Sequence, residues 1–173
     1  SIAATDLDAD GWPDLVVTND AIPNFYFRNK GDGTFEELGL LGGLALPGFG
    51  RPVSSMGVDA RDVTNDGRPD VIITALSGET FPLFTNEGDG VFRDATHQTG
   101  LATLTLGRSG WGVATADLDN DGWKDIATAN SHVNDEVDRF EASRYREPNA
   151  IFRNVGGRFE DVSAQAGEGF TDV

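Results

Sequence analysis

Short apolar runs alternate with polar, glycine-rich stretches along the whole chain. The clearest runs cover residues 2–5, 15–18, 56–60, 71–74, 111–116 and 126–129. Runs of this length that contain Val, Ile and Thr and are bounded by Gly, Asp and Asn favour β-strands over helices. The pattern therefore predicts an all-β protein.

The same order of runs occurs three times, which predicts tandem repeats. Between the paired runs lies an acidic segment that begins at Asp6, Asp62 and Asp117, so the starts are 56 and 55 residues apart. Two aromatic-bearing runs follow in each repeat, separated by Gly-Asp-Gly or Gly-Gly, which is typical of a tight hairpin turn.

Each repeat thus reads as four short antiparallel strands in about 55 residues, which is the size of a propeller blade. A two-sheet sandwich could be built from such strands, but it would not require near-identical units. We therefore predict three tandem four-stranded antiparallel β-propeller-type blades, as part of a propeller or as a repeat array. They form one repeat domain, residues 1–173. The repeats cover about 1–50, 51–105 and 106–173.

The third repeat carries an insertion near residues 131–149. Val133, Val137 and Phe140 fall at helical spacing within it, which allows a short amphipathic helix. Packing against a sheet edge is favoured for this segment over a dedicated ligand site.

The aromatic residues divide into two groups. Phe35, Phe92 and Phe159 recur at one position of the repeat, as core residues do, and a packed position is also expected for Trp111. Two further tryptophans, at positions 12 and 123, lie inside the acidic segments. They are equally compatible with packing and with exposure for stacking on sugars.

Composition narrows the possible partners. The formal net charge of −16 makes nucleic acid and anionic membrane surfaces poor partners. No apolar run reaches the roughly 20 residues of a membrane span, so membrane insertion is not expected. Cysteine is absent, which excludes disulfides and thiolate metal sites. The sequence begins at Ser1 without Met, which is compatible with removal of an N-terminal segment.

The acidic segments share the pattern Asp-x-Asp/Thr-x-Asp-Gly-x-x-Asp. Calcium prefers six to eight oxygen ligands, and alternate side chains can converge on one ion where Gly permits a sharp turn. We predict side-chain ligands at positions 1, 3, 5 and 9 and a backbone carbonyl ligand at position 7. The predicted ligands are Asp6, Asp8, Asp10, Trp12 and Asp14 in the first loop, Asp62, Thr64, Asp66, Arg68 and Asp70 in the second, and Asp117, Asp119, Asp121, Trp123 and Asp125 in the third.

Two alternatives to such a calcium loop are weaker. An EF-hand requires Glu at position 12, where the chain has Val17, Ile73 and Thr128. Metal-free turns rich in Asp and Gly remain an alternative, although four carboxylates within nine residues repel each other without a cation. The second loop has Thr64 at position 3 and is the weakest, so we expect two to three calcium ions.

Catalytic arrangements are not favoured. A glycosidase needs one special carboxylate pair in one cleft, whereas these clusters recur in every repeat. His97 and His132 lie near no motif that suggests a catalytic triad, and both are expected at the surface.

On the acidic loops and the glycine-rich turns that follow them, the chain resembles the FG-GAP/VCBS repeat family. Residues 131–134, 145–154 and 158–167 are similar to the repeat region of the ASPIC/UnbV group. The resemblance covers nearly the whole chain. It implies a β-propeller, often seven-bladed, with calcium in the blade loops, in proteins that are mostly non-catalytic and lie outside the cytoplasm. The sequence contains three repeats and no ASPIC/UnbV module, so functions of whole family members are not carried over.

The sequence therefore predicts a non-catalytic, calcium-binding extracytoplasmic scaffold or adhesion module. It would act outside the cell, at the cell surface or in the periplasm, through a protein partner or self-association. A carbohydrate-binding propeller module and an accessory domain of a secreted hydrolase are the alternatives.

Overall fold

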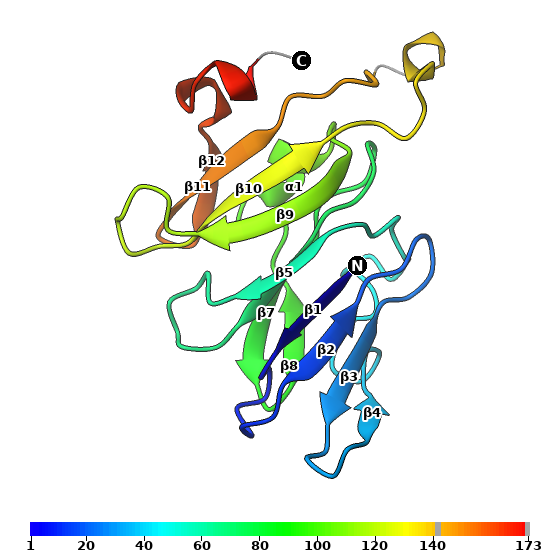
Figure 1. Cartoon of the computed structure of the whole chain (residues 1–173), viewed down its shortest axis with the longest axis vertical. Coiled ribbons are helices and arrows are strands. Elements are labelled where there is room, and N and C mark those ends of the chain that lie inside the picture. Colours follow the sequence, from blue (N-terminus) through cyan, green and yellow to red (C-terminus); the bar gives the residue numbers. More distant parts are fainter. Residues whose placement is uncertain (141–142, 172–173) are drawn as a thin grey trace.

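A computed structural model describes residues 1–140 and 143–171. Its described residues form three four-stranded antiparallel sheets, each built from strands that are consecutive in sequence (Figure 1). Sheet 1 contains β1 (Ile2–Thr5), β2 (Asp14–Val17), β3 (Phe25–Asn29) and β4 (Phe35–Glu37). Sheet 2 contains β5 (Val58–Arg61), β6 (Asp70–Ile73), β7 (Leu83–Gly88) and β8 (Val91–Asp94). Sheet 3 contains β9 (Gly110–Ala116), β10 (Asp125–Asn130), β11 (Ala150–Val155) and β12 (Arg158–Asp161).

The three sheets follow one another like blades around an axis. The first strand of each sheet lies innermost: β5 contacts both β1 and β9 (Figure 1). The three sheets of the described residues do not close into a ring. This confirms the predicted all-β fold of three antiparallel propeller-type blades.

The core lies between neighbouring sheets. Alternate residues of a strand point to opposite faces, so each sheet can pack on two neighbours. One apolar cluster joins Val16 and Tyr26 of sheet 1 to Val71 and Phe84 of sheet 2. A second cluster joins sheets 2 and 3, and includes Phe152. The middle sheet is therefore buried on both faces, and β6 is buried along its whole length.

Segments that follow the last strand of a sheet also enter these clusters. Leu44 follows β4 and Leu101 begins α1 (Leu101–Thr105), and both side chains are fully buried between sheets. Because these segments contact two sheets, the repeat boundaries near residues 50 and 105 stay a prediction.

Helical structure is limited to α1 and three single 3₁₀ turns, η1 (Val137–Arg139), η2 (Ser163–Gln165) and η3 (Glu168–Phe170), in the described part of the chain. The insertion near 131–149 thus holds one 3₁₀ turn, with Val137 buried and Val133 and Phe140 exposed. Residues 141–142 of this insertion lie outside the described residues. Within residues 1–140 and 143–171, no helix has the length and apolar character needed to cross a bilayer.

Three expectations about single residues are wrong. Phe35 is 46% exposed, whereas Phe92 and Phe159 are 6% exposed, because Phe92 and Phe159 pack on the preceding sheet and sheet 1 has none among the described residues. Trp111 lies in β9 and is 48% exposed, held by a hydrogen bond from its indole Nε1 to the Ser131 carbonyl (2.6 Å). His132 is buried, and its Nδ1 accepts a hydrogen bond from the backbone N–H of Asn134 (3.0 Å).

Candidate metal sites

The three acidic loops connect the first and second strands of each sheet and share one backbone conformation. The residue at position 4 has a positive φ in each loop: Ala9 at 62°, Asn65 at 58° and Asn120 at 60°. The Gly at position 6 also has a positive φ, of 87–93°. Only Gly adopts this conformation without strain, which explains its presence in every loop. The loops therefore curl in the same way despite different side chains at position 4.

Carboxylates at positions 1 and 5 hold this curl by accepting backbone N–H groups. In the first loop, Asp6 Oδ2 accepts the N–H of Gly11 (2.9 Å) and Asp10 Oδ1 accepts that of Trp12 (2.9 Å). Equivalent bonds occur in the second loop and in the third. The two positions thus fix the loop whether or not they ligate an ion.

The carboxylate at position 9 begins the second strand and is buried. Asp14 accepts the N–H of Leu7 on Oδ2 (3.0 Å) and that of Asn29 on Oδ1 (2.8 Å). Asp125 accepts the corresponding N–H groups of Leu118 and Asn154 (2.9 and 2.8 Å). This residue ties the loop to the third strand of its own sheet, so its position is fixed by the fold.

Two of the loops gather three carboxylates. Ligand oxygens of Asp6, Asp8 and Asp14 lie within 4.8 Å of one another, and so do those of Asp117, Asp119 and Asp125. Oxygens that share a calcium ion at about 2.3–2.6 Å are separated by at most about 5 Å. The two groups therefore fit a hard divalent cation. Asp10 and Asp121 are not part of them.

Two carboxylates of the first group, those of Asp8 and Asp14, have a pKa raised above the ordinary value of an aspartate. Burial raises the pKa of Asp8 above its ordinary value, and the nearby charges of Asp10 and Asp6 add to this. Burial also raises the pKa of Asp14, against the opposing hydrogen bonds from the N–H groups of Asn29 and Leu7. A divalent cation among these oxygens would oppose both shifts, because it favours the ionised forms.

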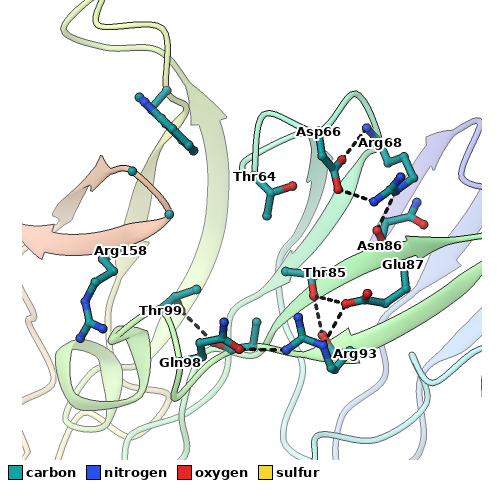
Figure 2. Close-up of a pocket in the computed structure, with 14 residues that line it drawn as sticks. Thr64, Asp66, Arg68, Thr85, Asn86, Glu87, Arg93, Gln98, Thr99 and Arg158 are labelled. Carbon is teal, nitrogen blue, oxygen red and sulfur yellow. Dashed lines mark hydrogen bonds and ion pairs between the residues drawn. The ribbon is translucent and has the colours of Figure 1, made fainter.

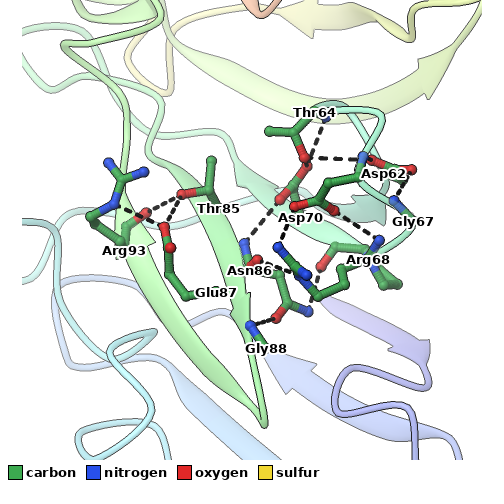
Figure 3. Close-up of polar contacts among 12 residues, drawn as sticks. Asp62, Thr64, Gly67, Arg68, Asp70, Thr85, Asn86, Glu87, Gly88 and Arg93 are labelled. Atoms are coloured by element: carbon green, nitrogen blue, oxygen red, sulfur yellow. Dashed lines mark hydrogen bonds and ion pairs between the residues drawn. The ribbon is translucent and has the colours of Figure 1, made fainter.

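The second loop is held by a different network (Figure 3). The Thr64 hydroxyl donates to Asp70 Oδ2 (3.1 Å) and lies 3.5 Å from Asp62 Oδ1. Arg68 pairs with Asp66 (2.5 Å) and also donates to the carbonyl of Asn86 (2.9 Å). A hydroxyl and a guanidinium thus supply hydrogen-bond donors at positions where the first and third loops have Asp and Trp. Burial raises the pKa of Asp70.

The position 7 residues differ in their surroundings. Trp12 is 51% exposed and lies against the hairpin turn of sheet 1. The indole Nε1 of Trp12 is 2.6 Å from the point where a Cβ would lie at Gly31, so only glycine leaves room for the ring there. The ring of Trp123 is half-buried beside the gap between sheets 2 and 3. Coordination through the carbonyls of Trp12, Arg68 and Trp123 stays a prediction.

A groove of about 420 Å³ lies between sheets 2 and 3, next to the second loop (Figure 2). Asp66, Arg68 and Asn86 lie at one end, and Arg158 lies across the groove from Arg93. Arg93 is bonded to Glu87 (2.9 Å) and Gln98 (3.0 Å). The groove therefore offers guanidinium, amide and hydroxyl groups beside the Trp123 ring.

These repeated loops and sheets match a known repeat. The model of the FG-GAP-like repeat matches residues 6–73 and again residues 62–128. The chain belongs to the FG-GAP-like repeat family. Both matches begin at the first Asp of an acidic loop and reach into the second strand of the following sheet, so the family signature contains the candidate metal site.

Individual relatives are covered over only part of their own length. The chain is 29% identical over 122 residues to cartilage acidic protein 1 of Xenopus tropicalis, which is 68% of this chain and 16% of that protein. The chain thus spans about a sixth of this relative.

Two solved structures are similar over 92% of this FG-GAP chain. One is an Agrocybe aegerita lectin that recognises non-reducing terminal N-acetylglucosamine, with 22% identity, a TM-score of 0.47 and 36% of its chain covered. The other is the Photorhabdus luminescens Tc holotoxin pore, with 19% identity, a TM-score of 0.45 and 7% of its chain covered.

The sequence prediction missed the asparagine at the end of the third strand. Asn86 and Asn154 are buried and bond to the acidic loop of the preceding sheet. The signal was present, because Asn occurs six residues before the recurring Phe in repeats 1 and 2 and five before it in the shortened third repeat.

Proposed function

We propose that this FG-GAP chain is a non-catalytic, calcium-stabilised interaction module that acts outside the cytoplasm. The observation that carries the proposal is the pair of three-carboxylate groups placed at the same point of sheets 1 and 3. Asp6, Asp8 and Asp14 would hold one ion, and the matching residues of sheet 3 would hold a second. Calcium would link the loop to its second strand and offset repulsion between carboxylates.

The charge pattern and the family support a binding role over catalysis. The carboxylates recur at equivalent points of the sheets, and FG-GAP repeats are typically non-catalytic modules. Calcium is abundant outside the cytoplasm, so sites of modest affinity would fill there. Loops carried on rigid sheets would then present a stable surface to a protein partner.

Calcium titration by isothermal calorimetry tests the proposal. We expect two ions per chain and a higher melting temperature in calcium than in chelator, because the ion binds the folded loops and not the unfolded chain. Asp8→Asn and Asp119→Asn should each remove one ion. Asp138→Asn, at an exposed acid outside the loops, is the matched control. A chain that binds no calcium, or melts equally in chelator, would contradict the proposal.

A carbohydrate-binding role is the second candidate, favoured by the groove beside Trp123. Aromatic rings stack on sugars, and the groove's arginines and amides could bond to hydroxyl or carboxylate groups. Binding to a glycan array that is lost in Trp123→Ala and kept in Trp111→Ala, which replaces an exposed tryptophan of β9, would support this role. An array without any bound glycan would argue against it.

A further inference from the structure

The two interfaces between sheets are built from the same residues. Phe92 of β8 packs on sheet 1, with its ring 5.8 Å from the Tyr26 ring in an edge-to-face arrangement. Phe159, at the same position of β12, packs in the cluster that contains Ile72 and Leu83 of sheet 2. In sheets 2 and 3, the phenylalanine of the fourth strand therefore packs against the preceding sheet.

Two hydrogen bonds accompany this packing, and both occur twice. Asn86 Nδ2 donates to the Leu7 carbonyl and Asn154 Nδ2 donates to the Val63 carbonyl, each at 2.8 Å and buried. The acceptors are position 2 of the preceding acidic loop. The backbone N–H of Phe92 donates to the Gly42 carbonyl (2.7 Å), and that of Phe159 donates to the Thr99 carbonyl (2.9 Å). We call these two bonds and the inserted phenylalanine the inter-sheet latch.

Sheet 1 carries the donor half of a third latch. Phe35 holds the position of Phe92 and Phe159 and is 46% exposed. Asn29 holds the position of Asn86 and donates within its own sheet to the Pro13 carbonyl (3.0 Å). Asn86 makes the same bond to Pro69 (3.1 Å) in addition to its bond across the interface. The second amide hydrogen of Asn29 is therefore available to a sheet placed before sheet 1.

Sheet 3 carries the acceptor half. Leu118 holds the position of Leu7 and Val63, but it is 49% exposed where they are 2% exposed. Leu118 lines a shallow cavity together with Ile151 and Ala166. Ala166 lies seven residues after the recurring phenylalanine of its repeat, as Gly42 and Thr99 do in theirs. Its carbonyl is thus the expected acceptor for a Phe35 N–H.

One position of the acceptor half differs from its equivalents. A glycine with positive φ lies eight residues after each recurring phenylalanine, and the next residue is Leu44 or Leu101 in the first two repeats. Both leucines are completely buried between sheets. The third repeat has Glu168 there, and it is exposed. A carboxylate at a buried leucine position weakens packing, so the third latch is weaker than the two within the chain.

We propose that sheet 1 of one copy docks head to tail on sheet 3 of a second copy through this latch. A second copy supplies both halves of an interface that the chain already forms twice, so the exposed faces of sheets 1 and 3 of the 173-residue chain match each other. Two such contacts would bring six sheets together, within the four to eight blades that close a propeller. A head-to-tail contact gives a closed ring when the rotation closes, and a filament when it does not.

The proposal rests on the interaction role proposed above, but not on calcium. Sedimentation velocity of the 173-residue chain across a concentration series tests it, with calcium binding measured on the same samples. We expect concentration-dependent self-association. Phe35→Ala should weaken it at least about tenfold, because burial of a phenylalanine is lost from the contact while the side chain is exposed in the isolated chain. Phe140→Ala, at another exposed phenylalanine, should leave it unchanged.

Glu168→Leu provides the complementary test. Leucine at position 168, as at the equivalent positions of the first two repeats, should strengthen association about tenfold or more. Phe35→Ala in the same chain should cancel this gain in affinity. Association that is insensitive to Phe35→Ala overturns the proposal, and so does a chain that stays monomeric with and without Glu168→Leu. If the chain is monomeric but binds calcium, only the docking is refuted. If the chain does not bind calcium, the proposed function is refuted and the association data are unaffected.

Discussion

Replacing Thr64 by Asp should turn the second acidic loop into a calcium site. Thr64 is the one side chain at position 3 that is not a carboxylate, and its hydroxyl donates to Asp70 (3.1 Å). In Thr64→Asp the loop would carry Asp at positions 1, 3 and 9, as the loops of sheets 1 and 3 do. The substitution removes a donor and adds a charge.

Its effect on stability should depend on calcium. Two unit charges about 4 Å apart repel by about 1 kcal/mol in water and by about 4 kcal/mol at an effective dielectric constant of about 20. Since this loop is partly exposed, we expect the free energy of unfolding in chelator to fall by about 2 kcal/mol. At a calcium concentration of about 100 times Kd, each site adds about 2.7 kcal/mol. Three sites in place of two should therefore raise the calcium-dependent gain about one and a half times.

Thermal unfolding in chelator and in calcium, with calorimetric titration for stoichiometry, measures both quantities. We expect Thr64→Asp to melt below the wild type in chelator and to bind three ions in place of two. For a chain of this size about 1 kcal/mol shifts the melting temperature by about 2–4 °C, so the extra site adds roughly 5–11 °C to the calcium-dependent shift.

Two substitutions serve as controls. Thr103→Asp adds the same charge on the exposed face of α1, and it should change neither stoichiometry nor the calcium-dependent shift. Asp119→Thr, the reverse change in the third loop, should remove one ion. If Thr64→Asp binds no additional calcium while it still folds, the carboxylate at position 3 does not decide metal binding, and the assignment of the other two sites loses its basis.

Two further predictions concern stability. Asn86→Ala should lower the free energy of unfolding by about 3 kcal/mol, because the buried Leu7 carbonyl loses its hydrogen-bond donor. Thermal unfolding should show a larger loss of stability in Asn86→Ala than in Asn29→Ala. Equal losses in the two variants would refute a role of Asn86 across the interface. Asp161→Asn should cost about 1 kcal/mol at neutral pH. Although burial opposes ionisation of Asp161, hydrogen bonds from Ser163 and the ion pair with Arg108 lower its pKa. The stability that ionised Asp161 contributes is therefore fully present above the pKa of an unfolded Asp and is lost as the pH falls through the lowered pKa. The free energies of unfolding of the wild type and Asp161→Asn, measured with denaturant, should therefore converge in acid. A difference that stays constant with pH would count against the ion pair.

The strands and their order could be predicted because each repeat contains the full local signal. The strand β2 begins at Asp14, one residue before the apolar run, because the backbone of Asp14 pairs with Thr5 of β1. The number of sheets and the antiparallel order followed from repetition, which a single repeat could not have provided.

The environment of single side chains could not be predicted from the repeat. Phe35 and Phe92 occupy one repeat position, but only Phe92 has a sheet to pack on within the described chain. Likewise, the sequence showed that Thr64 weakens the second loop, but not that Arg68 would pair with Asp66 there. Both facts depend on contacts between segments that lie far apart in the sequence or on side-chain directions, and local pattern contains neither.

The hydrogen bonds between sheets also bear on how such chains change in length over evolution. Asn86 and Asn154 each bond to a main-chain carbonyl, which every residue type provides, and the acceptors are Leu7 and Val63. Loss of one whole unit by unequal recombination would place Asn154 opposite Leu7 and leave neither amide nor carbonyl without its partner. Gain of a unit would be accommodated in the same way, so this hydrogen bond sets no limit on the number of units, whereas it does require the asparagine amide.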